Sequence, residues 1–445
     1  MNFLLNFFFD GFSKNDKKRI SKNFFSQINT NLFRIIIQFI FPPLMIIVYG
    51  LETFGVWIFL TNIPLVLNAF NFNLNEAAKI EMSIYFNKKN YKKVNVIFNN
   101  SIITTFIIIF FLIIFSIFFF KFYNFDLNIL QSISDNLKFI IVLIFLTFFL
   151  DLLNSIFVNS ITFFGRIDVS TYLEFFFDFL GKTLIIIAGI ISGDLLITSI
   201  FFMINSLMKI LIYYLYFLNT NKHLKFLKFQ YFSKKEVLRL LKLSIPHYLE
   251  TINFIVRNSL QIILIGIFFN GQIVGMISVL KTLFFFLPIR IWGIISKSLL
   301  FEFTKIIVSK KIFLLNKTLK KILSFSTYIS IIFLTLCYFF GNKVLALWLN
   351  NSYEVNNMLI MLICFDVILI SFGSFFKLVG KSVNQFLLIM KIDLLVSVLI
   401  ILLSSIIFLK YNNFQIIFML NIVGSSIYAI FSIINYNKLL KNKLI

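Results

Sequence analysis

The sequence predicts an all-α integral membrane protein with about twelve transmembrane helices in two six-helix bundles around a central cavity. The first observation is composition: 60% of the 445 residues are hydrophobic and only 13% are charged, with a mean hydropathy of +0.95. A water-soluble chain of that composition would expose large apolar patches. The second is that the apolar residues form long runs separated by short segments rich in Asn, Lys and Gly. The third is that most cationic residues lie in those short segments, as membrane topology requires.

The apolar runs are long enough for one crossing each, since a spanning helix needs about 20 residues. Reading along the chain, we expect spans centred near Ile37, Pro64, Ile109, Phe149, Leu184, Met208, Gln261, Phe286, Ile331, Phe365, Val398 and Val423. The apolar start of the chain lacks a basic region before it and is followed by Lys14, Lys17 and Lys18 instead of small residues. This order predicts an uncleaved N-terminus on the cytoplasmic side.

The distribution of Lys and Arg predicts the orientation of the spans. Basic clusters occur at 14–22, 79–93, 222–242, 305–321 and 438–443, all in segments that fall on one side if the N-terminus is cytoplasmic. The segments on the other side contain only Lys121, Lys138, Lys343 and Lys410. The high content of Phe, Ile, Asn and Lys is typical of an AT-rich bacterial genome. We therefore expect a multi-pass protein of the bacterial inner (plasma) membrane, with both termini cytoplasmic.

The long basic loop divides the chain into two groups of six spans. We expect an N-terminal six-helix bundle at 1–218, a basic cytoplasmic loop at 219–242 and a C-terminal six-helix bundle at 243–445. All prolines fall in spans one, two, seven and eight, which are equivalent pairs if a six-span unit was duplicated (Pro42, Pro43, Pro64, Pro246, Pro288). These helices are the expected cavity walls, although proline can also simply bend a helix. The segment 76–100 mixes Lys with apolar residues and predicts an interfacial amphipathic helix.

This layout resembles the polysaccharide-flippase (O-antigen, Wzx-type) branch of the multidrug/oligosaccharidyl-lipid/polysaccharide (MOP) exporter superfamily. The matching features are two six-span halves with a basic central loop, Ser244-Ile245-Pro246 opening span seven, the turn at Gly271 to Gly275, and 341–348 after span nine. The resemblance implies a MATE-like fold whose cavity opens alternately to the two sides. It also implies an undecaprenyl-pyrophosphate-linked oligosaccharide as substrate. The sequence departs from drug-exporting relatives because the first helix has no acidic residue.

Arginine usage indicates where a diphosphate would bind. In this lysine-rich chain, Arg34, Arg257 and Arg290 all fall inside predicted spans. A planar guanidinium can grip a pyrophosphate through two parallel hydrogen bonds, and an intramembrane charge usually faces the bundle interior. The alternative is that these arginines reach the headgroups or form structural ion pairs.

Two polar stripes surround these arginines at helical spacing. In span one the stripe is Gln27, Asn31, Arg34 and Gln38; in span seven it is Glu250, Asn253, Arg257 and Gln261. Aligning Arg34 with Arg257 superimposes the two stripes, as expected for equivalent helices that face one cavity. The candidate substrate-binding residues are therefore Arg34, Arg257, Arg290, Gln27, Asn31, Gln38, Glu250, Asn253 and Gln261. The competing interpretation is that these groups only hydrogen-bond to neighbouring helices.

The other charges in predicted spans have simpler interpretations. Asp178 and Lys182 are four residues apart and are expected to pair. Lys281 and Lys297, near the two ends of span eight, are expected to extend toward the headgroups. Asp151, Asp366 and Asp393 are candidates for carrying protons or binding a coupling cation such as Na⁺.

Several functions are excluded by missing motifs. Gly181-Lys182-Thr183 and Gly380-Lys381-Ser382 lack the earlier glycine of a phosphate-binding loop. Neither histidine has a partner at ligand spacing, and Cys337 and Cys364 read as small core residues, so no metal or cofactor is expected. The basic residues do not form a nucleic-acid surface.

We expect a transporter, not an enzyme, whose partners are a lipid-linked oligosaccharide and membrane lipids. The alternatives are a cation-coupled drug exporter of the same superfamily and a membrane polysaccharide polymerase or ligase. A polymerase or ligase would need a longer external loop carrying an acid–base pair, which the sequence lacks.

Overall fold

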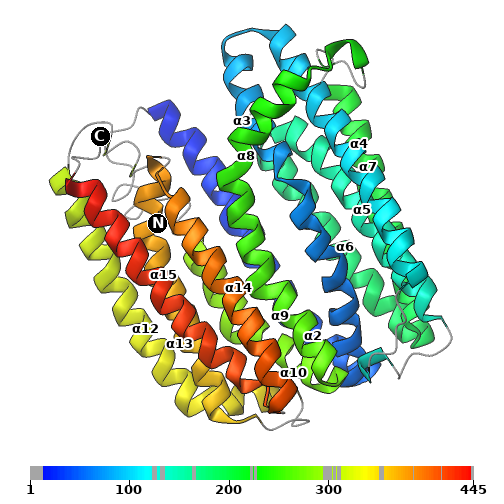
Figure 1. Ribbon diagram of the computed structural model, residues 1–445, viewed down its shortest axis with the longest axis vertical. Helices are drawn as coiled ribbons and strands as arrows, with labels where there is room; N and C mark the ends of the chain where they lie inside the picture. The colour runs from blue at the N-terminus through cyan, green and yellow to red at the C-terminus, as the bar shows by residue number, and fades with distance from the viewer. Residues whose placement is uncertain are drawn as a thin grey trace. The chain divides into compact units, whose positions relative to one another are not determined.

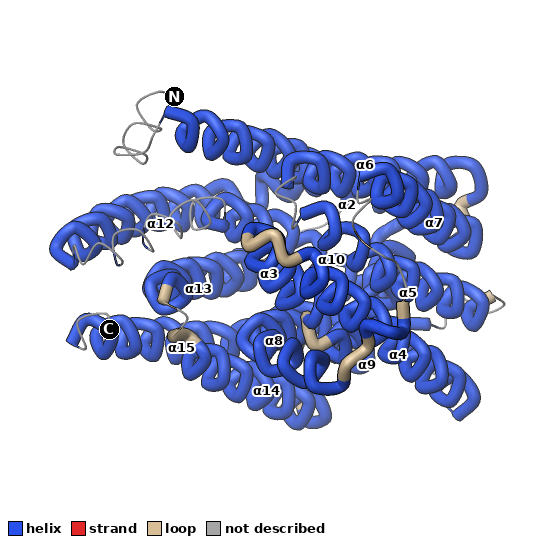
Figure 2. The backbone as a smooth tube through the Cα atoms, turned by 90° about the horizontal axis from the view of Figure 1, so that it is seen from above, coloured by secondary structure: helices blue, strands red, loops and turns tan. Residues whose placement is uncertain are grey.

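The computed structural model describes residues 14–122, 128–130, 136–162, 167–220, 224, 228–293, 303, 307, 312–349, 355–383, 385–411 and 413–441. Within these residues every regular element is a helix (Figure 2). Eleven of the helical segments are long and apolar enough to cross a membrane. The predicted all-α membrane fold is therefore confirmed, and each predicted span centre lies inside one of these segments.

Figure 1 shows the helices in the order of the chain. The long ones are α2 (Lys14–Leu67), α4 (Tyr91–Phe122), α5 (Leu137–Thr162), α6 (Ile167–Ser192), α7 (Leu195–Thr220), α8 (Lys234–Ile255), α12 (Ile312–Trp348), α13 (Asn357–Ser382), α14 (Leu387–Lys410) and α15 (Gln415–Lys441). The shorter ones are η1 (Asn68–Asn71), α3 (Leu74–Asn87), η2 (Asn128–Leu130), η3 (Phe229–Tyr231), η4 (Val256–Leu260), α9 (Gln261–Phe268), α10 (Gly271–Leu280) and η5 (Lys281–Phe286).

A backbone break at Gly50 makes α2 two helices. Gly50 has φ 80° and ψ 164°, a conformation that residues with a side chain rarely adopt. The segment Asn29–Asn71 has 43 residues and would extend about 65 Å as one straight helix, twice the roughly 30 Å hydrocarbon core. The break therefore divides this segment at the boundary between the predicted spans one and two, so that the eleven described segments are compatible with the twelve predicted spans.

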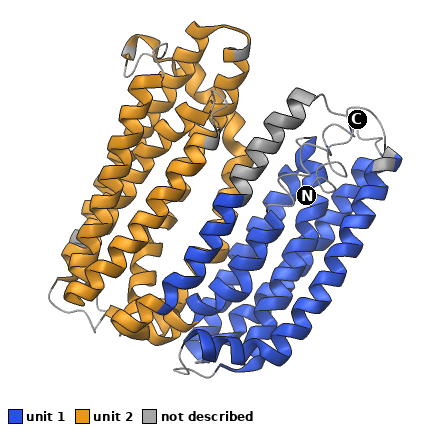
Figure 3. Ribbon diagram, turned by 180° about the vertical axis from the view of Figure 1, so that it is seen from behind, with its two compact units in different colours: residues 1–43, 277–445 blue, residues 44–276 orange. Residues whose placement is uncertain are grey.

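The chain forms two compact units (Figure 3). Unit 1 contains residues 1–43 and 277–445, and unit 2 contains residues 44–276. Span one is thus grouped with spans nine to twelve and with span eight from Ile277 onward, whereas span seven is grouped with spans two to six and the first residues of span eight. The boundaries of these units differ from the predicted division of the chain at 219–242. The duplication of a six-span unit, from which that division was inferred, stays a prediction.

Unit 2 has an aromatic core at the end where α3 lies. Leu74, Ala78 and Met82 on one face of α3 are buried in it, together with Phe98 of α4 and Phe217 of α7. The Phe98 and Phe217 rings stack with centroids 5.5 Å apart. The helix expected over 76–100 is therefore present only as α3, which ends at Asn87, because residues 91–100 already belong to α4. Its location at a membrane interface stays a prediction.

Glycines allow two backbones of unit 2 to touch. A Cβ atom added to Gly55 would lie 1.8 Å from the carbonyl oxygen of Gly271, and one added to Gly275 would lie 2.5 Å from the carbonyl oxygen of Leu51. No side chain fits there, so α2 and α10 approach as closely as small residues permit in membrane helix pairs. The Gly271 to Gly275 segment singled out in the sequence is thus a packing site.

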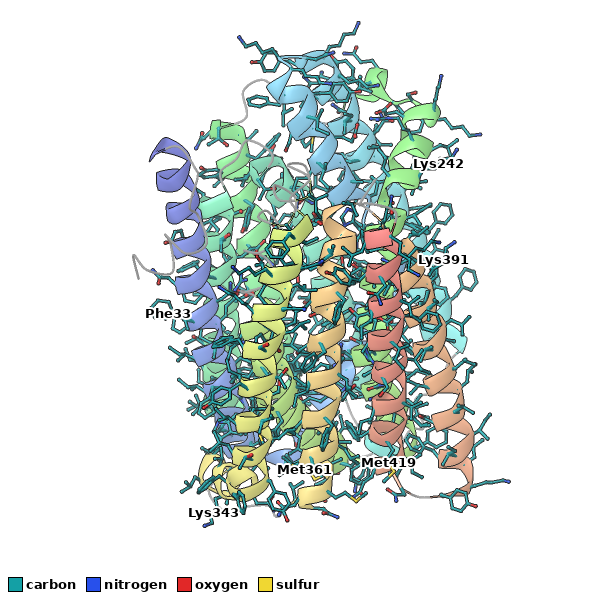
Figure 4. All side chains as sticks on the ribbon, turned by 90° about the vertical axis from the view of Figure 1, so that its left-hand side faces the viewer. Phe33, Lys242, Lys343, Met361, Lys391 and Met419 are labelled. Carbon is teal, nitrogen blue, oxygen red and sulfur yellow. The ribbon has the colours of Figure 1, made fainter. Side chains whose placement is uncertain are left out.

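In unit 1, α13 is the central packing helix and contacts α12, α15 and η5. Cys337 of α12 and Cys364 of α13 are buried, unbridged and in contact with each other. One helical turn away, Gly341 lies against Ile360. The sequence prediction that both cysteines are small core residues agrees with their burial between α12 and α13. Lys343 and Lys391 lie toward opposite ends of unit 1 (Figure 4).

Candidate functional site

The polar stripe of span seven lies on a helix that belongs to unit 2. Arg257 is 8% exposed, Asn253 is 6% and Gln261 is 2%, whereas Phe254 on another face of the same helix is 57% exposed. Glu250, one turn before Asn253, is partly buried. The predicted stripe therefore points away from the surrounding lipid. Its role in substrate binding remains a prediction.

Arg257 lies in a local widening of the helix that the sequence did not predict. Residues 256–260 form a π-helix between the α-helical α8 and α9. Such bulges are rare and occur frequently at functional sites, because they cost backbone stability and redirect side chains. Here the wider turn buries two consecutive polar residues, Asn258 and Ser259, each 5% exposed.

Asn258 and Ser259 were missed by the sequence prediction, which assumed ideal α-helical spacing. With these residues, span seven has five buried polar side chains around its middle (Asn253, Arg257, Asn258, Ser259, Gln261). Asn258 Nδ2 donates to the carbonyl oxygen of Phe254 at 3.1 Å. The signal in the sequence was the polar run Arg257-Asn258-Ser259 itself, which no single α-helical face could bury.

The polar stripe of span one lies in the first arm of α2. Asn31, Arg34 and Gln38 are partly buried, whereas Phe33 and Ile36 are 54% and 50% exposed. Figure 4 shows Phe33 on the outer side of this arm. The stripe is therefore on the less exposed face of the helix, as predicted. The side chain of Gln27 lies outside the residues whose side chains the structure describes.

A proline in span one leaves one backbone carbonyl oxygen without its helical hydrogen bond, and Trp348 donates a hydrogen bond to that oxygen instead. Pro43 has no N–H to donate to the carbonyl oxygen of Phe39, four residues earlier. Trp348 Nε1 at the end of α12 donates to that oxygen at 2.8 Å, and the Phe39 and Trp348 rings stack 5.0 Å apart. This contact holds the helix that carries Arg34 within unit 1.

In span eight the structure changes the expected assignment of the cations. Arg290 is partly buried, as expected for a residue facing inward. Lys281, expected to extend to the headgroups, is only 3% exposed, and its Nζ lies 5.8 Å from the centre of the Phe285 ring. That expectation was wrong, because Lys281 begins a second π-helix, η5, which turns its side chain into the protein. Lys297 lies outside the described residues.

The acidic residues of the spans have separate surroundings. Asp151 of α5 forms an ion pair with Lys209 of α7, with Oδ1 and Nζ 3.1 Å apart. Asp366 of α13 is 4% exposed and accepts a hydrogen bond from Ser425 Oγ of α15, and Asp393 is 7% exposed. Asp178 is exposed on α6 and Lys182 is partly buried. The predicted pairing of Asp178 with Lys182 stays a prediction.

The described residues contain no group of three His, Cys, Asp or Glu side chains arranged to hold a metal ion. The candidate residues are mainly cationic and amide side chains, together with the carboxylate of Glu250. Such groups can bind anions and hydroxyl groups without covalent chemistry.

Comparison with solved structures identifies the fold. The chain is similar to an inward-facing multidrug resistance MATE family transporter of the MOP superfamily, with TM-score 0.69 and 10% identity over 92% of this chain and 95% of that one. It is similar to the lipid II flippase MurJ in an inward closed conformation, with TM-score 0.66 and 17% identity over 94% and 90%. A MOP superfamily transporter from Pyrococcus furiosus gives TM-score 0.59 and 13% identity over 96% of each chain. No family model matches the sequence, and no curated protein matches it significantly.

Proposed function

We propose that this chain, which has the fold of MOP transporters, flips an undecaprenyl-pyrophosphate-linked oligosaccharide, such as an O-antigen or capsule repeat unit, across the bacterial inner membrane by alternating access. The observation that carries the proposal is Arg257, buried at 8% exposure in the π-helical turn of span seven among amide and hydroxyl side chains. The likeness of the fold to a lipid II flippase supports it.

The chemistry of the site suits the two polar parts of such a substrate. Arg34 and Arg257 are the proposed contacts of the diphosphate, because guanidinium binds phosphate oxygens through two hydrogen bonds. Asn253, Asn258 and Gln261 can both donate and accept, which suits sugar hydroxyl groups. The polyprenyl tail needs no binding group because it can stay in lipid. Arg290 and the remaining stripe residues, Gln27, Asn31, Gln38 and Glu250, are proposed to line the same path.

A cation-coupled drug exporter is the second candidate. Asp366 favours it, since a buried carboxylate in a span can carry a proton or bind a cation, and the fold is shared with a multidrug transporter. However, a pocket for cationic drugs is expected to be acidic or apolar, and the stripes described above carry arginines. For the similar transporter from Pyrococcus furiosus, the reverse polarity of the binding pocket suggests a different function. The polarity of the binding pocket is therefore the property that distinguishes a flippase from a drug exporter.

The test replaces each arginine by Ala and by Lys. Arg34→Ala and Arg257→Ala should reach the membrane in normal amounts and abolish export of the surface polysaccharide. Binding of undecaprenyl diphosphate to the purified protein should weaken roughly ten- to hundredfold, since a hydrogen bond to a charged group contributes about 1.5–3 kcal/mol. Lys should rescue only partly because it lacks the planar fork.

Lys410→Ala is the control, because Lys410 is an exposed cation in the last turn of α14 and does not belong to a stripe. Normal surface polysaccharide in the Arg34→Ala, Arg257→Ala double variant would refute the proposed anion site. If drug resistance instead were lost in Asp366→Asn while polysaccharide export stayed normal, the drug exporter would be the better assignment.

A further inference from the structure

The helix α3 and the starts of α4 and α8 lie at one end of unit 2 (Figure 1). Their charged side chains form two layers. In the inner layer Glu236, only 6% exposed, accepts from Lys93 Nζ at 3.0 Å and from Arg239 at 2.6 Å. Arg239 also reaches Glu81 Oε2 at 2.7 Å. Two acids and two bases from three helices thus neutralise one another.

Asparagine side chains hold the segment before α8 against this layer. The backbone N–H of Lys228 donates to Asn99 Oδ1 at 2.7 Å. Asn100 donates from Nδ2 to the carbonyl oxygen of Tyr231 at 2.9 Å and accepts at Oδ1 from the Ser233 N–H at 2.8 Å. The start of α8 is therefore fixed on α4, and the lysines near it have a defined position.

The outer layer consists of exposed lysines that the acids of the inner layer do not neutralise. They are Lys88, Lys89, Lys92, Lys234, Lys235 and Lys242. Within the described part of the chain none of them has an acidic partner, and Lys88 lies over the Tyr85 ring at 5.9 Å. Lys242 extends away from α8 (Figure 4). The surface thus has a strong positive charge.

Exposed apolar side chains stand next to these lysines on the same helices. On α3, Ile80 and Ile84 are 44% and 42% exposed and precede Lys88 by whole turns. On α8, Leu238 is 51% exposed and lies between Lys235 and Lys242 at helical spacing. Helices that alternate lysine with exposed aliphatic residues are typical of a membrane interface and not of a surface in bulk water.

The length of span seven places this surface at the level of the headgroups. The helix from Lys234 to Phe268 has 35 residues and extends about 52 Å, some 20 Å more than the hydrocarbon core. The apolar residues are concentrated in its second half. The first turns, which carry Lys234, Lys235 and Lys242, therefore leave the core on one side.

We propose that these exposed lysines bind the phosphate headgroups of acidic phospholipids, such as phosphatidylglycerol, while the neighbouring aliphatic side chains enter the upper acyl region. Basic residues next to membrane helices attract acidic lipids by about 1 kcal/mol each, within a Debye length of the surface. The inner ion pairs keep the three helices together beneath this layer. The inference does not depend on the transported substrate.

The test compares two triple variants of the full-length purified protein that have the same net charge. Lys89→Gln, Lys92→Gln, Lys235→Gln changes the proposed surface, and Lys138→Gln, Lys343→Gln, Lys410→Gln changes exposed lysines elsewhere. The measurement is the shift in melting temperature during titration with short-chain phosphatidylglycerol, with phosphatidylcholine as the reference lipid. Phosphatidylglycerol should stabilise the unchanged protein and the control triple equally, and should bind the first triple roughly tenfold or more weakly.

Size-exclusion profiles establish that both variants are folded, since only exposed side chains change. High salt should reduce the phosphatidylglycerol effect in the unchanged protein, because exposed charges are screened. An equal effect of both triples, or no preference for phosphatidylglycerol over phosphatidylcholine, would overturn the proposal. So would equal stabilisation by inorganic pyrophosphate without lipid, which would indicate a site for soluble anions.

Discussion

Asp151 shows how a single contact changes the interpretation of a charged residue. From the sequence it was a candidate for proton or cation coupling, as is any acid in a span. In the structure its carboxylate lies 3.1 Å from Lys209 Nζ, and both side chains are partly exposed. A carboxylate that is already paired with an ammonium group does not offer a free site for a coupling cation. We therefore expect the pair to have a structural role, joining α5 to α7.

Exchanging the two residues tests this role. Asp151→Asn should lower stability by about 1 kcal/mol or less, since partly exposed ion pairs contribute little. The double variant Asp151→Lys, Lys209→Asp should recover both the melting temperature and transport, because the pair is restored in reverse. Restored stability with transport still absent would show that the carboxylate is needed at position 151 itself.

Buried cations were predicted correctly in one case and wrongly in another, and the difference is local geometry. Arg257 belongs to a run of polar residues at helical spacing, so its inward direction follows from the pattern. Lys281 was assigned to the headgroups from its distance to the end of the span alone. Its side chain lies in a π-helical turn that contacts α13, and ideal α-helical spacing does not predict such a turn.

At the scale of helices, hydropathy was sufficient to locate every span but not their breaks. Long apolar runs must be helical in lipid because each backbone group needs a partner. Hydropathy placed separate spans near Ile37 and Pro64, on either side of Gly50, but it did not indicate the backbone conformation at Gly50. The π-helix at 256–260 leaves the apolar pattern unchanged, so no window average detects it. Proline was the better signal, since it identified spans one, two, seven and eight as irregular.

The contact between Trp348 and the carbonyl oxygen of Phe39 gives a test of how a proline-broken helix is held. Trp348→Phe keeps the stacked ring but removes the donor, and should lower stability by about 1 kcal/mol. Pro43→Ala supplies a backbone N–H that can bind the same oxygen. Trp348→Phe should therefore lower the free energy of unfolding less in the Pro43→Ala variant than in the unchanged protein.

The measurement is thermal unfolding of the four proteins of this double-mutant cycle in detergent. If Trp348→Phe lowers the stability equally with and without Pro43→Ala, the indole hydrogen bond does not replace the one that Pro43 cannot donate.

At the scale of the whole molecule, each compact unit contains one helix from the other half of the chain. Span one belongs to the unit built from the C-terminal half, and span seven to the unit built from the N-terminal half. A reciprocal exchange of this kind is expected if a six-span unit was duplicated, and the exchanged spans are the two that carry the polar stripes. The sequence predicted the equivalence of these spans but not the exchange, because hydropathy contains no information on which helices are neighbours.

The orientation of the whole chain can be tested with single cysteines in a background that lacks Cys337 and Cys364. We predict that Lys89→Cys, Lys228→Cys and Lys317→Cys react with a membrane-impermeant maleimide only after the cells are opened. Lys138→Cys, Lys343→Cys and Lys410→Cys should react in intact cells. Labelling of position 228 from outside would contradict the predicted topology.

The hydrogen bond from Trp348 to Phe39 also has a consequence for biosynthesis. Its two residues are 309 positions apart. At about 5–20 residues per second, the ribosome needs roughly 15 to 60 seconds to make the second residue after the first. During that time the first helix to be inserted has an unsatisfied carbonyl group and the charge of Arg34, while most of its packing partners are not yet translated. We therefore expect its early residence in the bilayer to depend on the insertion machinery, and mutations in it to affect yield before they affect transport.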